Sequence, residues 1–229
     1  MKKFFSAVVA LVIFFTANNL ASAESSPEWV KNLLEAKNAT QMVVVAATSG
    51  SKAKVSMHEK DSAGNWQQIM KTDAFIGKNG LGKTREGDSK TPVGTFIFNA
   101  AFGIYPDPGC AIPYTQVDEN IYWSGDGREG KRYNEMVDIR DIPDLNTKDS
   151  EHIIDYKPYY YYCLNISYNK EGMAGKGSAI FMHCWNKAKP WTGGCVALPE
   201  EKMLFVMKNV RPDCVVVINS FENIKNGGI

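Results

Sequence analysis

The sequence has few histidines, almost no net charge and no long apolar run beyond its N-terminus. Only 3 histidines are present and no two cysteines are separated by two residues, so the chain lacks the ligand spacing of a structural zinc site. Its 26 Lys+Arg and 25 Asp+Glu nearly cancel, which leaves no long-range field to attract nucleic acid or anionic lipid. We therefore expect no metal site, no nucleic-acid partner and, after the N-terminal segment, no membrane span.

Residues 1–23 are typical of a signal peptide. A short basic start at Lys2 and Lys3 precedes an apolar stretch over residues 4–16, and the Ala-Ser-Ala at residues 21–23 is a cleavage site of small residues. A helix needs about 20 apolar residues to cross a bilayer, and this apolar stretch is shorter than that. We therefore expect cleavage after Ala23, rather than an uncleaved anchor, and a secreted, extracytoplasmic protein.

The rest of the chain predicts a mostly β domain with two or three helices. Residues 24–40 are predicted to be an N-terminal helical segment, because Ser26 can cap a helix and Pro27 suits its first turn. A second helix is expected from Pro199 to Asn209. Alternating or β-branched runs predict strands at residues 41–48, 52–58, 66–76, 95–98, 159–168, 178–183 and 214–219. No repeat or linker interrupts residues 41–229, so they are predicted to form one domain.

The stretch GKNGLGKT at residues 77–84 matches the letter pattern of a phosphate-binding loop. That mechanism needs a helix directly after the loop, so that backbone N–H groups and the helix dipole meet the phosphates. Gly87 and Pro92 oppose a helix there. The stretch is therefore interpreted as a surface loop beside a sheet and not as a nucleotide site.

The chain has an odd number of cysteines, Cys110, Cys163, Cys184, Cys195 and Cys214. In an exported protein many thiols pair, but five leave at least one unpaired. Which of the five form disulfides is not deducible from the sequence. The leftover thiol is a first indication that one cysteine is kept for chemistry.

The segment HCWNKAKPWTGGCVALP, residues 183–199, places a histidine twelve positions before a cysteine. Cys195 has four interpretations: half of a disulfide, a metal ligand, a packing residue or a nucleophile. A metal would need partners, and Cys184 is eleven positions away with no second histidine near. Gly193 and Gly194 leave the approach to the sulfur open and let the backbone turn sharply, unlike an apolar packing run.

The nucleophile interpretation accounts for most of these residues. His183 ends a predicted strand, and an imidazole in reach of Cys195 can take the thiol proton to leave a thiolate–imidazolium pair. The N–H groups of Gly194 and Cys195 are the expected donors to the oxyanion of acyl transfer. Thr192 is expected to orient the loop or contact substrate. A disulfide-bonded Cys195 remains the alternative.

Three stretches together resemble the L,D-transpeptidase catalytic domain, a YkuD-like family. SAIFMHC followed by TGGCVALP is similar to its active-site signature, EGDSKTPVGTFIF at residues 86–98 resembles a second family motif, and residues 106–134 resemble a segment of one branch. Two positions depart from the pattern, because Ala197 stands where many members have Arg and Gly193 where several have His.

The resemblance implies an L,D-transpeptidase-like β-sandwich, with helices packed on it, that acts on peptidoglycan stem peptides without a cofactor. Cys195 would form a thioester with the donor stem and His183 would serve as general base and acid. A second stem's amine would then complete a cross-link, whereas water would make the enzyme an L,D-carboxypeptidase. A non-catalytic wall-binding module is the remaining alternative. Candidate substrate-binding residues are Thr192, Gly193, Trp185, Tyr133 and Asn134.

Overall fold

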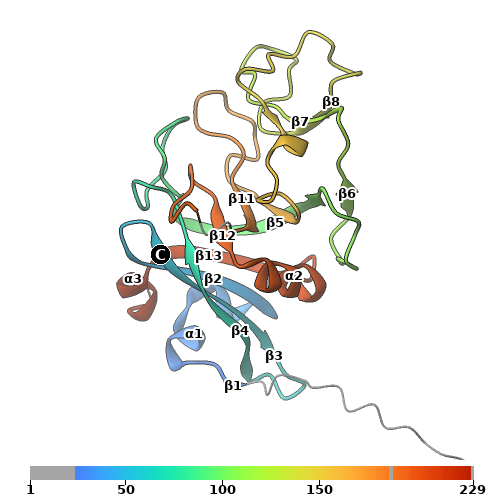
Figure 1. The fold of residues 1–229 in the computed structure, drawn as a ribbon. Coiled ribbons are helices and arrows are strands. Elements are labelled where there is room, and N and C mark those ends of the chain that lie inside the picture. The colour runs from blue at the N-terminus through green and yellow to red at the C-terminus, as the bar shows by residue number, and fades with distance from the viewer. Residues whose placement is uncertain (1–23, 186–187, 228–229) are drawn as a thin grey trace, which may run out of the picture.

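The structure is a computed structural model that describes residues 24–185 and 188–227 (Figure 1). The predicted signal peptide, residues 1–23, lies outside the described residues. Within the described part, no helix is long and apolar enough to cross a membrane. The elements are β1 (Glu24–Ser25), α1 (Glu28–Asn32), the 3₁₀ helix η1 (Leu34–Lys37), β2 (Gln41–Ser49), β3 (Lys52–Lys60), β4 (Trp66–Phe75), β5 (Gly94–Gly103), β6 (Tyr114–Gln116), β7 (Ile121–Trp123), β8 (Met136–Asp138), β9 (Glu151–His152), the 3₁₀ helix η2 (Ile153–Asp155), β10 (Cys163–Ile166), β11 (Phe181–Cys184), β12 (Val196–Leu198), α2 (Glu200–Asn209), β13 (Val215–Ser220) and α3 (Phe221–Lys225).

The main sheet closes on itself. Its strands follow the order β1-β4-β12-β11-β10-β5-β13-β2-β3, and β3 also pairs with β4. Closure leaves few unpaired strand edges, which is how barrel-like sheets avoid edge-to-edge association. The predicted mostly β fold with two or three helices is confirmed. The pairings describe one barrel-like sheet, and the two-layer sandwich stays a prediction.

Strand β2 is buried on both faces, which explains its continuous apolar sequence. Val43 and Val45 point into the main core, inside the sheet. Met42 and Val44 point the other way, into a second core that also holds Val30 of α1. The N-terminal and C-terminal helices α1 and α3 lie together beside this outer face (Figure 1).

The N-terminal helix is shorter than predicted. Helix α1 ends at Asn32, because Leu33 is extended with ψ 140° before η1 begins. That break lets Leu33 join Val30 in the second core, both almost fully buried, while Leu34 turns out to solvent at 63% exposure. The second predicted helix is confirmed as α2, with Pro199 at its N-cap.

A long insertion between β5 and β10 builds one wall above the main sheet. It carries a small antiparallel sheet of β8, β7 and β9, which lies at one end of the molecule (Figure 1). The predicted strand 159–168 is regular only over β10, because Tyr159 and Tyr160 belong to the turn before it. Those two rings thereby contact His183 of the neighbouring strand.

Candidate active site

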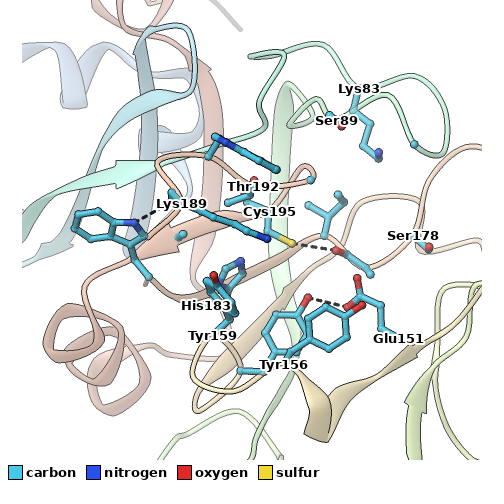
Figure 2. A pocket seen from close by; sticks show the side chains of 18 of the residues that line it. Lys83, Ser89, Glu151, Tyr156, Tyr159, Ser178, His183, Lys189, Thr192 and Cys195 are labelled. Carbon is cyan, nitrogen blue, oxygen red and sulfur yellow. Dashed lines mark hydrogen bonds between the residues drawn. The ribbon is translucent and has the colours of Figure 1, made fainter. Parts of the chain in front are cut away.

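Strands β11 and β12 bring His183 and Cys195 to one cavity. The two strands run parallel and pair His183 with Ala197, two residues after the cysteine. A cavity of about 380 Å³ is lined by both side chains (Figure 2). Cys184, on the opposite face of β11, is buried in the main core. None of the five cysteines, which all lie in the described residues, is in a disulfide.

His183 is held in a single tautomer. Its Nδ1 lies 2.7 Å from the carbonyl oxygen of Cys184, and because a carbonyl only accepts, Nδ1 must carry the proton. Nε2 is then the free, basic nitrogen. Burial lowers the pKa of His183 to about 4, so the ring is neutral at neutral pH and is able to accept a proton.

The Cys195 thiol is buried and protonated at rest. Its Sγ donates to the carbonyl of Ala179 at 3.1 Å and accepts from the N–H of Phe181 at 3.4 Å. Burial, with a smaller contribution from the nearby Glu151 carboxylate, raises the pKa of the thiol to about 12. The resting dyad is therefore a neutral thiol beside a neutral imidazole, and the thiolate–imidazolium pair expected from the sequence is not the resting state.

The turn before Cys195 is fixed by hydrogen bonds of its own. Thr192 Oγ1 donates to the carbonyl of Cys195 at 2.7 Å and accepts from the N–H of Gly194 at 3.1 Å. The Gly194 N–H, an expected oxyanion donor, is thus engaged at rest. The Cys195 N–H has no acceptor among the residues that the structure describes, so it is the available donor.

Gly194 has a backbone that only glycine adopts easily. Its φ is +149°, and a Cβ added there would lie 2.8 Å from the carbonyl oxygen of Lys90. Thr91, in the second motif, fixes the same peptide, because its hydroxyl donates to the Gly194 carbonyl at 2.7 Å and accepts from the Gly77 N–H at 2.8 Å. The sequence pointed to the stretch around Thr91 but assigned it no role.

The loop at residues 77–94 is built around a buried ion pair. Lys83 Nζ lies 3.1 Å from Asp88 Oδ1, and both side chains are almost fully buried. The Asp88 carboxylate also accepts the backbone N–H groups of Thr84, Arg85 and Lys90. Burial alone would raise the pKa of Asp88, but these hydrogen bonds hold it far below the usual range. No helix follows, and the lysine is already paired, so the loop lacks the features of a phosphate site.

Three of the predicted substrate residues line the cavity, namely Thr192, Gly193 and Trp185. Tyr133 lines an adjoining cavity of about 370 Å³, and its hydroxyl donates to Glu86 at 2.7 Å.

Asn134 lines neither of these cavities. It is buried, and its Oδ1 accepts from Trp123 Nε1 and from the N–H of Ala179, both at 3.0 Å. Ala179 is in the left-handed region at φ 55°, and its carbonyl holds the Cys195 thiol. Asn134 therefore holds Ala179, whose carbonyl accepts the hydrogen bond of the thiol, and does not itself line either cavity.

Sequence reasoning missed two residues of the cavity wall, Glu151 and Tyr160. Tyr160 donates to Glu151 Oε2 at 2.7 Å, and its ring meets the His183 ring edge-on at a centroid distance of 5.4 Å. Both come from the insertion, whose position is set by tertiary packing, so no local pattern in the sequence marked them. Among the described residues no group of three or more His, Cys, Asp or Glu is placed to hold a metal.

Comparisons with known proteins bear on this site. No curated protein sequence matches the chain significantly. Among solved structures, the helical cell shape determining protein Pgp2 from Campylobacter jejuni is similar, with 16% identity and a TM-score of 0.41, over 84% of this chain and 54% of that chain. The chain thus spans about half the length of that structure. A family profile described as the L,D-transpeptidase catalytic domain, YkuD, matches residues 52–218. The chain belongs to the YkuD family of L,D-transpeptidase catalytic domains.

Proposed function

We propose that the protein is an exported peptidoglycan L,D-transpeptidase that forms cross-links between stem peptides through a thioester on Cys195. The observation that carries this proposal is the shared cavity of Cys195 and His183, with Nε2 of the imidazole free to accept a proton. Family membership supports the substrate class. Export rests on the signal-peptide pattern of residues 1–23.

The first half-reaction releases the D-residue of the donor stem. Cys195 Sγ attacks the carbonyl that joins an L-centre to the following D-residue, and His183 Nε2 takes the thiol proton. The oxyanion is stabilised by the N–H of Cys195. When the tetrahedral intermediate collapses, the C–N bond breaks, His183 returns the proton to the leaving amine, and the thioester remains.

A neutral resting dyad determines the timing of the proton transfer. The low pKa of His183 and the high pKa of Cys195 both oppose charge separation between the two side chains. Proton transfer therefore accompanies attack on the carbonyl, as in general-base catalysis, rather than preceding it. The thiol must also leave the Ala179 carbonyl and turn toward Nε2, so substrate binding is expected to trigger that rotation.

The second half-reaction needs room for an incoming amine. The cavity of about 380 Å³ and the adjoining cavity of about 370 Å³ share the lining residues Glu86, Glu151, Ser178 and Ala179. One space therefore suits the donor stem and the other the acceptor. This two-sided arrangement supports transpeptidation over simple hydrolysis, in which water replaces the amine.

Incubation of the mature protein with purified muropeptides tests the proposal. Mass analysis should detect cross-linked dimers, and intact-protein mass should detect an acyl adduct that Cys195→Ala does not form. Shortened monomers without dimers would instead identify a carboxypeptidase. No adduct and no product would overturn catalysis and leave a wall-binding module. Fractionation of cells with and without residues 1–23 tests export.

A further inference from the structure

Two carboxylates lie in the wall that the two cavities share. Glu151 and Glu86 line both spaces, yet neither forms an ion pair with any Lys, Arg or His of residues 24–185 and 188–227. Glu86 is exposed and accepts from Tyr133 and Ser178. Glu151 is partly buried, and its charge acts on the Cys195 thiol.

Glu151 is held in place by the small sheet and by Tyr160. It begins strand β9, where it pairs with Trp123 of β7, and its Oε2 accepts the Tyr160 hydroxyl at 2.7 Å. In Figure 2 Cys195 lies between His183 on one side and Glu151 on the other.

This position is unfavourable for the first half-reaction. A carboxylate near the sulfur opposes negative charge on it, and Glu151 is one of the groups that raise the pKa of Cys195. It equally opposes the oxyanion. A partly desolvated carboxylate without a cation is also costly in itself. Both costs are removed when a positively charged ligand group occupies the cavity beside Glu151.

We propose that Glu151 receives the ammonium group of the acceptor stem and removes one of its protons before the amine attacks the thioester. The inference rests on the proposed function, since it concerns the second half-reaction. The ammonium gives one proton to the Glu151 carboxylate and becomes a neutral amine. The amine nitrogen then forms the C–N bond as the C–S bond breaks. His183 takes the second proton from nitrogen and delivers it to sulfur, and Glu151 releases its proton to solvent.

The acid–base properties of Glu151 fit this role. Burial raises its pKa to about 7, with the Tyr160 hydrogen bond acting in the opposite direction and Glu86 adding to the rise. A base is most effective when its pKa is near the working pH. An ordinary carboxylate holds a proton too weakly to take one from an amine at a useful rate. Glu151 is therefore a better proton acceptor than an exposed glutamate.

The test compares a charged with an uncharged acceptor. Wild type and Glu151→Gln are acylated with a donor muropeptide, and the acyl-enzyme is offered glycinamide, which is an ammonium at neutral pH, or hydroxylamine, which is largely uncharged. The glutamine amide oxygen still accepts from Tyr160, so the wall keeps its shape. We expect the ratio of aminolysis to hydrolysis with glycinamide to fall about 10²-fold in the variant, and the ratio with hydroxylamine to stay within about threefold.

Glu129→Gln, an exposed carboxylate of the same insertion, is the matched control and should keep both ratios. If the ratio falls equally for both acceptors in Glu151→Gln, Glu151 has only a structural role. If the glycinamide ratio is unchanged, Glu151 plays no part in binding the acceptor. Either result overturns the inference but leaves the proposed function standing. Absence of an acyl-enzyme in wild type would instead overturn the proposed function.

Discussion

The Thr91 hydroxyl donates a 2.7 Å hydrogen bond to the backbone carbonyl of Gly194, across 103 positions of sequence. The same oxygen accepts from the N–H of Gly77. One side chain thus joins the loop after β4 to the turn that presents Cys195. Because the Gly194 carbonyl and the Cys195 N–H belong to the same peptide group, its orientation sets the direction of that N–H.

Thr91→Val should separate this hydrogen bonding from packing, since valine keeps the volume of threonine. Two buried backbone groups lose their partner, so the free energy of unfolding should fall by about 1–3 kcal/mol. Misorientation of the Cys195 peptide should lower kcat/KM by about 10²-fold. Thr91→Ser should recover most of both quantities. Thr84→Val, at an exposed threonine of the same loop, should change neither; an unaltered Thr91→Val enzyme would contradict the role given to the hydroxyl.

The two glycines before Cys195 should differ sharply in tolerance. A Cβ at Gly194 would meet Lys90 and Ile180 at 2.8 and 3.0 Å, with φ at +149°, whereas a Cβ at Gly193 meets nothing within 4 Å. Gly194→Ala should therefore lower the free energy of unfolding by about 1–3 kcal/mol. Gly193→Ala should change it by no more than about 0.5 kcal/mol. Chemical denaturation of both variants measures the difference. Equal stabilities would show that the turn relaxes freely.

Whether the sequence predicts a residue of the site depends on how far along the chain that residue lies from the others. His183 lies in β11 and Cys195 directly precedes the parallel strand β12, so a short stretch of sequence was enough to predict both. Glu151 and Tyr160 reach the site only because the insertion packs against β11, where Trp123 and Tyr160 contact Phe181. That placement depends on contacts among many residues, which no local periodicity encodes.

Periodicity likewise predicted the strands more accurately than their surroundings. The alternation in β3 correctly placed Ala53, Val55 and Met57 on the core face. His58, on the other face, is nonetheless fully buried, because the segment around α1 covers that part of the sheet. Alternation identifies two faces of a strand but does not reveal that a distant segment covers the second.

The neutral resting dyad predicts a distinctive ionisation of Cys195. Because burial raises the pKa of the thiol to about 12, the far-ultraviolet thiolate absorbance of wild type minus that of Cys195→Ser should be near zero at pH 7. The thiolate absorbance should appear only at pH values well above the ordinary pKa range of a thiol. His183→Asn should not change this difference at neutral pH. A thiolate signal at pH 7 that disappears in His183→Asn would establish a preformed ion pair instead.

His58 should make the fold sensitive to acid independently of the active site. Its Nδ1 and Nε2 each lie 2.8 Å from a serine oxygen, of Ser26 and Ser56, and burial, with the positive charge of Lys71 adding to it, lowers its pKa to about 4. The unfolded chain binds a proton near pH 6.5 that the folded chain does not accept until about pH 4, so stability is full above the higher value and falls as the pH drops between the two.

Glutamine is a neutral hydrogen-bonding residue that does not titrate. In His58→Gln, the unfolding free energy lost between pH 7.5 and pH 4 should therefore be smaller by about 3 kcal/mol. Urea unfolding of wild type and His58→Gln at pH 7.5, 6, 5 and 4 measures the change in slope. If the two proteins lose stability in parallel, the acid sensitivity belongs to other groups, and the buried His58 is not what links folding of this chain to pH.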